Sequence, residues 1–147
     1  MAKPTRQDPP PPAGYSGTPL IRKLGIKPGF RLWLSDEPGH YPDLLGPLPE
    51  GAREARPREK DLEFAHVFAL TEASLRRGLE RARGRSAPDG MVWASWPKKS
   101  SGVRTELDGN IVRRVGLAAG LVDVKVCAID DTWSGLKFVF RLVDRPK

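Results

Sequence analysis

The chain has 147 residues and a formal net charge of +7, with 25 Lys and Arg against 18 Asp and Glu. This length suits one domain of ordinary size, and a 39% hydrophobic content is enough for one core. The single cysteine, Cys127, excludes an internal disulfide and suits a reducing compartment. No stretch approaches the roughly 18 apolar residues of a membrane span, and no signal peptide opens the chain. We therefore expect a soluble, cytoplasmic protein with no membrane partner.

The basic excess is concentrated in two regions. Residues 1–29 carry five basic residues and one acidic residue, and residues 91–120 carry five and two. A dedicated nucleic-acid face would show a denser basic stripe with aromatic residues between the charges. We therefore expect only weak electrostatic attraction to nucleic acids.

Residues 1–14 are polar and rich in proline, and the run Pro9–Pro12 favours polyproline II over a helix or central strand. We interpret this segment as a disordered arm. The alternative is a polyproline ligand for a protein partner. Residues 15–147 are expected to form a single domain.

The first helix is expected where Thr18 can cap it and Pro19 suits its first turn, and Gly25 ends it. Residues 30–34 are apolar and predict the first strand. The next expected elements are a short helix at 41–45, an edge strand at 52–56, a strand at 64–70, a helix at 72–83 and a strand at 90–96.

The last third of the chain predicts one more helix and two strands. The run Thr105–Asp108 resembles a capping box and precedes a helical apolar stripe. Residues 121–129 and 136–143 are apolar strands, joined too tightly for a crossover, so they must pair antiparallel. Alternation of strands and helices predicts an α/β fold. We expect a Rossmann-like three-layer sandwich with a mostly parallel sheet and a C-terminal antiparallel strand pair.

Ligands of open parallel sheets bind beyond the carboxyl ends of the strands. Four loops are expected there, at residues 35–37, 71–72, 97–102 and 130–135. The candidate ligand-binding residues in and beside these loops are Ser35, Asp36, Trp96, Lys98, Lys99, Ser100, Ser101, Gly102, Trp133 and Ser134.

The run Lys98–Gly102 is chemically suited to a phosphate or carboxylate, because ammonium groups, hydroxyls and loop amides can all donate to an anion. It is not a P-loop, which has a glycine at a fixed distance before its Gly-Lys-Ser/Thr. The alternative interpretation is a solvated basic turn with ordinary helix capping.

Aromatic and acidic residues near the turns allow two interpretations each. We expect Trp93 in the core, whereas Trp96 and Trp133 either pack in the core or stack on a planar ligand. The pair Asp130-Asp131 fits a hairpin turn better than a metal site or a base. No other His or carboxylate stands at metal-ligand spacing.

The two histidines and the cysteine indicate no catalytic set. His66 lies within a predicted strand and is expected to be a hydrogen-bonded core residue. His40 lies in a turn and can approach the Ser35–Asp36 loop, with a catalytic role as the less favoured alternative. Cys127 is expected to be an unreactive thiol that packs within its strand. We assign no catalytic residue and no metal ligand.

Several segments resemble the bacterial domain of unknown function 3052 family, from about Gly14 to Leu142. The segments that carry the resemblance are Gly14–Leu20, Leu24–Gly29, Trp96–Gly102, Gly120–Asp130 and Trp133–Lys137. The resemblance implies a small bacterial protein with no assigned activity, so it adds no site residues.

The layout also resembles the class I S-adenosylmethionine-dependent methyltransferase fold. The run Leu24–Leu32 is similar to the helix, turn and first strand at the start of those enzymes, and the terminal antiparallel strands also fit. Such enzymes follow the first strand with an acidic residue and a Gly-x-Gly loop against the cofactor. Here residues 35–41 provide one glycine beside a proline.

We therefore expect a non-enzymatic or regulatory domain that binds a small, phosphate-bearing anion or a protein partner at the strand-end crevice. Lys98, Lys99, Ser100 and Ser101 would hold the anion, and Trp96 or Trp133 would form a wall. The first alternative is a divergent S-adenosylmethionine-dependent methyltransferase. The second is a basic protein weakly associated with nucleic acid.

Overall fold

The computed structural model describes residues 18–141, so the predicted arm at residues 1–14 lies outside the described part. Six strands form one sheet, and they are β1 (Arg31–Ser35), β2 (Arg53–Glu54), β3 (Leu62–Phe68), β4 (Ser86–Pro97), β5 (Leu121–Ala128) and β6 (Trp133–Phe140). The helices are α1 (Leu20–Leu24), α2 (Tyr41–Leu45), α3 (Glu72–Arg85), the 3-10 turn η1 (Lys99–Ser101) and α4 (Gly109–Ala118).

The strand order is β2-β1-β3-β4-β6-β5, and β1 pairs in parallel with both β2 and β3. The β3–β4 pair is parallel as well, whereas β6 is antiparallel to both of its neighbours, β4 and β5. Five strands therefore run one way and β6 alone runs the other way. This arrangement confirms the predicted mostly parallel α/β sheet and the C-terminal antiparallel strand pair.

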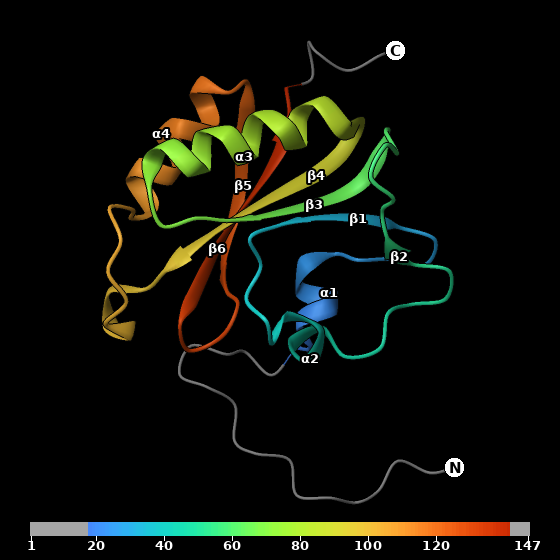
Figure 1. The fold of residues 1–147 in the computed structure, drawn as a ribbon, viewed down its shortest axis with the longest axis horizontal. Helices are drawn as coiled ribbons and strands as arrows, with labels where there is room; N and C mark the ends of the chain where they lie inside the picture. Colours follow the sequence, from blue (N-terminus) through green and yellow to red (C-terminus); the bar gives the residue numbers. More distant parts are fainter. Residues whose placement is uncertain (1–17, 142–147) are drawn as a thin grey trace, which may run out of the picture.

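Helices cover both faces of the sheet, which makes three layers (Figure 1). On one face, α3 and α4 bury their apolar stripes, including Leu75, Leu79 and Val112, against the central strands. On the other face, α1 and α2 pack over aromatic side chains that include Phe64 and Trp93. Burial of this apolar surface on both sides explains why β3 reads as a continuous apolar run. The predicted core position of Trp93 is confirmed.

Some boundaries differ from the predictions. The cap of α4 is Asp108, whose Oδ1 accepts a hydrogen bond from the Ile111 amide at 2.9 Å. Thr105 does not cap the helix, because α4 begins only at Gly109. The Thr105 hydroxyl instead donates to the Leu70 carbonyl at 2.6 Å and accepts from the Leu107 amide at 3.0 Å, so it fastens the loop to the end of β3. At α1, Pro19 occupies the capping position predicted for Thr18, and no side chain caps the helix.

The strands also begin and end at other residues than predicted. The last strand starts at Trp133, not at residue 136, because the preceding turn is tighter than expected. Helix α3 continues through Gly84 to Arg85 and leads directly into β4, which is longer than the predicted 90–96. The β2 strand is shorter than the predicted 52–56, and β3 lies two residues earlier than predicted.

Candidate functional site

The sheet has a switch point between β1 and β3. From β1 the chain moves to one side to form β2, and it then crosses to the other side to form β3. In open α/β sheets such a point leaves a crevice at the carboxyl ends of the strands, where ligands bind. A pocket of about 510 Å³ lies there, within the range of small-molecule sites. This switch-point pocket is lined by Asp36, Phe68, Ala69, Leu70, Thr71, Ser74, Val103 and Trp133.

Trp133 reaches this pocket because β6 is antiparallel, so its first residue lies at the edge where the parallel strands end. The Asp130 side chain builds the turn before it, since its Oδ1 accepts hydrogen bonds from the Thr132 and Trp133 amides at 2.9 and 2.7 Å. This geometry confirms the predicted turn role of Asp130. Phe68 packs edge-on against the Trp133 indole, with ring centroids 5.0 Å apart. The turn thus fixes the Trp133 backbone, and Phe68 packs against its indole.

Asp36 is the first residue beyond β1 and brings a carboxylate to the same pocket. Its φ of 57° lies in the left-handed region, which costs energy for most side chains and is tolerated best by Gly, Asn and Asp. Backbone outliers of this kind cluster at functional sites. Asp36 thus makes a glycine-like turn after the first strand while adding a negative charge.

Two residues of the lining carry hydroxyl groups and come from the point where β3 passes into α3. Thr71 caps α3, and its Oγ1 accepts a hydrogen bond from the Ser74 amide at 3.1 Å. The Ser74 hydroxyl donates to the Thr71 carbonyl at 3.1 Å. Both hydroxyls line the pocket beside the apolar Leu70 and Val103.

The predicted anion loop lies beside the pocket and does not line it. The Lys98 amide donates to the Thr132 carbonyl at 2.7 Å, so the loop abuts the turn that carries Trp133. The Ser101 hydroxyl donates to the Lys98 carbonyl at 2.7 Å and accepts from the Val103 amide at 3.1 Å. Lys99 and Ser100 are exposed on η1, and Gly102 ends it with a φ of 77°. Val103, the residue that follows this loop, does line the pocket.

The remaining predicted residues, Trp96, Ser134 and Ser35, do not line the pocket. Trp96 is 7% exposed and packs in the core under α3 and α4, on the other face from Trp133. Ser134 pairs with Trp96 in the β4–β6 ladder. Ser35 ends β1 opposite Val67. Asp36 and Trp133 are thus the two predicted site residues that the structure brings into one pocket.

Each histidine has a clear partner. His40 Nε2 lies 2.9 Å from Asp130 Oδ2, which joins the loop after β1 to the turn before β6. His66 is buried between Tyr41 Oη and Ser95 Oγ, each at 2.8 Å, which confirms the predicted hydrogen-bonded core histidine. Burial lowers the pKa of His66 to about 3 and raises that of Tyr41. All three side chains are buried, and none of them lines the switch-point pocket.

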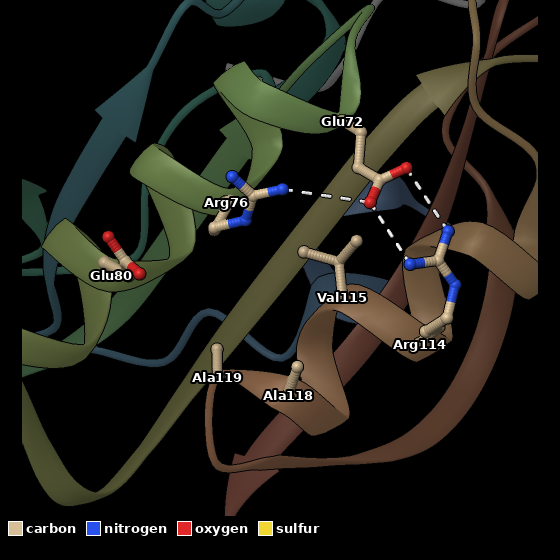
Figure 2. A pocket seen from close by; sticks show the side chains of 7 residues that line it. All are labelled: Glu72, Arg76, Glu80, Arg114, Val115, Ala118 and Ala119. Carbon is tan, nitrogen blue, oxygen red and sulfur yellow. Dashed lines mark hydrogen bonds and ion pairs between the residues drawn. The ribbon is translucent and has the colours of Figure 1, made fainter.

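A second hollow of about 240 Å³ lies between α3 and α4 (Figure 2). Glu72 is paired there, because the Arg114 guanidinium holds its carboxylate at 3.1 Å and Arg76 approaches the same carboxylate at 3.8 Å. These ion pairs lower the pKa of Glu72. The groove therefore offers no unpaired charge to a ligand from Glu72.

Over residues 18–141, no group of three or more His, Cys, Asp or Glu side chains is placed to hold a metal ion. In the same range, no helix is long and apolar enough to cross a membrane. Cys127 is partly buried beside the α1 and α2 core, and burial raises the pKa of its thiol.

The fold is similar to those of several solved structures. A S-adenosylmethionine-dependent methyltransferase from Aquifex aeolicus matches with a TM-score of 0.59 and 12% identity, over 81% of this chain and 86% of that chain. Fibrillarin from Aeropyrum pernix, solved with natively bound S-adenosyl-L-methionine, matches with a TM-score of 0.52 and 16% identity, over 86% and 70%.

A possible exported protein from Bordetella parapertussis matches with a TM-score of 0.59 and 10% identity, over 82% of this chain and 65% of that chain. The fold is methyltransferase-like. Identities this low show the fold alone. No family model and no curated protein sequence matches the chain, so the resemblance to the domain of unknown function 3052 family stays a prediction.

Several lining residues escaped prediction. Phe68, Ala69 and Leu70 read simply as the end of an apolar strand, and Val103 as part of a loop. Only the rule that ligands gather at carboxyl ends of parallel strands pointed to this region. Nothing in the local sequence pairs Val103 with Trp133, because that neighbourhood depends on the β4–β6 register.

Proposed function

We propose that this chain binds a nucleoside sulfonium cofactor of the S-adenosylmethionine class in the switch-point pocket, and that it acts as a divergent methyltransferase. One observation carries the proposal. The ligand crevice of a methyltransferase-like fold is lined here by an indole, a phenyl ring, two hydroxyls and a single carboxylate.

The lining fits the chemistry of that cofactor. The Trp133 ring offers a flat apolar surface of the kind on which a purine stacks. Asp36 offers negative charge to a ligand that carries sulfonium and ammonium groups. Its left-handed backbone makes the turn after β1 without the glycines found there in the enzymes that the sequence resembles. The bound cofactor would supply the methyl group, and the pocket would orient it, which is the main catalytic demand of such a transfer.

An anionic ligand fits this pocket less well. Among the described lining residues Asp36 alone carries a charge, and it would repel a phosphate. The predicted anion groups on Lys98–Ser101 lie outside the lining, and the Ser101 hydroxyl already has two backbone partners. These observations favour the methyltransferase alternative over the anion-binding hypothesis.

Isothermal titration calorimetry tests the proposal with S-adenosylmethionine, uncharged 5′-methylthioadenosine and ATP. We expect the first two ligands to bind, and Trp133→Ala to weaken both by about ten-fold or more because a stacking surface is lost. Asp36→Asn should weaken S-adenosylmethionine more than methylthioadenosine, since only the former presents cationic groups to the carboxylate. Lys99→Ala, on the neighbouring turn, is the matched control and should change neither affinity.

Two results would contradict the proposal. The first is no detectable binding of S-adenosylmethionine at millimolar concentration. The second is tighter binding of ATP that Lys99→Ala abolishes and Trp133→Ala leaves unchanged, which would restore the anion site at the Lys98–Gly102 loop.

A further inference from the structure

The switch-point pocket has two walls that are far apart in the sequence. Asp36 comes from the loop between β1 and α2, and Trp133 comes from the turn between β5 and β6. His40 closes the first loop and Asp130 opens the second turn. Their side chains meet, with His40 Nε2 at 2.9 Å from Asp130 Oδ2, across 90 positions of sequence.

Asp130 uses its two oxygens for two different purposes. Oδ1 accepts from the Thr132 and Trp133 amides and so fixes the turn that carries the indole. Oδ2 is left for His40. A shift of the His40 imidazole therefore also moves the Asp130 carboxylate, and with it the turn that positions Trp133.

We infer that His40 and Asp130 form a proton-sensitive clasp that holds the two walls of the switch-point pocket together and so regulates ligand affinity there. The inference rests on the proposed function for the identity of the ligand. His40 and Asp130 act as positioning residues, because they work through Trp133 and the Asp36 loop and do not themselves line the pocket.

Imidazole is the side chain that can change its charge near neutral pH, so a contact between a histidine and a carboxylate can respond to protons. Protonated His40 attracts the Asp130 carboxylate, whereas neutral His40 retains a hydrogen bond without the charge attraction. The other histidine, His66, does not respond in this range, since burial lowers its pKa to about 3. Besides Asp36, the charged groups on the clasped segments, on α1 and on the neighbouring turn are Glu37, Asp43, Asp131, Arg22, Lys23, Lys98 and Lys99.

The expected effect is modest because His40 is 50% exposed and Asp130 14% exposed at their side chains. Ion pairs near the surface change equilibria by about two- to five-fold. We therefore expect 5′-methylthioadenosine to bind about two- to five-fold more tightly at pH 6.0 than at pH 8.5. This probe has no group that titrates in that interval.

Three variants separate the clasp from other effects of pH. His40→Gln keeps a hydrogen-bond donor without the titration, and Asp130→Asn keeps an oxygen for the turn amides without the charge. Both should abolish the pH dependence of affinity. Asp131→Asn removes a carboxylate from the same turn and should leave the pH dependence intact. Persistence of the pH dependence in His40→Gln, or its loss in Asp131→Asn, would overturn the inference.

Hydrogen exchange of the ligand-free protein tests the clasp independently of any nucleoside. After correction for intrinsic exchange, the amides of residues 36, 37, 39 and 40 should be better protected at pH 6.0 than at pH 8.5, and His40→Gln should remove the difference. Equal protection in wild type and His40→Gln would overturn the clasp. A protection difference without nucleoside binding would contradict the proposed function and leave the clasp standing.

Discussion

His66 shows what a single buried side chain imposes on the molecule. It lies within β3, hydrogen-bonded to Tyr41 and Ser95, and stacks on Phe68 at a centroid distance of 4.2 Å. Because a charged imidazole there would lose its hydration, burial lowers its pKa to about 3. The folded state therefore requires a neutral His66.

This requirement predicts a pH dependence of stability. An unfolded chain protonates its histidine below about pH 6.5, whereas folded His66 does so only near pH 3, so the unfolded state binds more protons between these values. Stability should fall as the pH drops below 6.5, by at most about 1.4 kcal/mol per pH unit. Urea unfolding between pH 7 and pH 5 measures the slope. His40→Gln should retain it, and a flat profile in the wild type would show that His66 is not held neutral.

Trp96 and Trp133 show where residue-level prediction ends. Both stand beside turns in the sequence, so either qualifies as a ligand wall. The β4–β6 register pairs Trp96 with Ser134 and Trp133 with Pro97, which places the two indoles on opposite faces of the sheet. Strand register depends on long-range pairing that neither local sequence contains. The same applies to His40 and Asp130, whose contact no local pattern predicts.

At the scale of elements, α3 depends on a close approach to the sheet. A Cβ added at Gly78 would lie 2.5 Å from Val67 Cγ1 of β3, whereas one added at Gly84 would meet no atom within 4 Å. Both glycines lie in the same helix. Gly78 is thus a packing requirement, and Gly84 is not.

We therefore expect Gly78→Ala to destabilise the protein by about 1–3 kcal/mol through overpacking. Gly84→Ala, the matched control, should stabilise it by up to about 1 kcal/mol because alanine favours helix. Chemical denaturation of both variants measures the difference. Equal effects of the two substitutions would mean that the Val67 side chain can move aside and that α3 is not closely packed against β3.

Most elements could be predicted because each carries a local signal. Gly25 ends α1 in the left-handed conformation as expected, and the apolar run of β3 indicated burial on both faces. The predicted capping box was wrong because the helix starts later, with Asp108 as its cap, and Thr105 lies in a loop that its hydrogen bond to the Leu70 carbonyl fixes in place. The insertion of β6 between β4 and β5 also needs the whole sheet.

At the scale of the whole molecule, the strand order decides where a ligand can sit. The strand β2 lies on one side of β1 and β3 lies on the other, which makes the switch point. Because β6 is antiparallel to its neighbours, it begins at the edge where the parallel strands end. The loop that carries Asp36 and the turn that carries Trp133 therefore meet at one edge of the sheet (Figure 1). This edge and two of its lining residues, Asp36 and Trp133, could be predicted from the sequence. The ligand chemistry was expected on the basic loop beside the pocket, because a lysine pair is conspicuous in a sequence and an apolar lining is not.

A crystal structure of the protein with S-adenosylhomocysteine tests the central claim most directly. We expect the nucleoside at the carboxyl ends of β1 and β3, with its purine against Trp133 and the amino group of the homocysteine part near Asp36. A nucleoside seated instead in the groove between α3 and α4, or on the Lys98–Gly102 loop with the switch-point pocket empty, would contradict it.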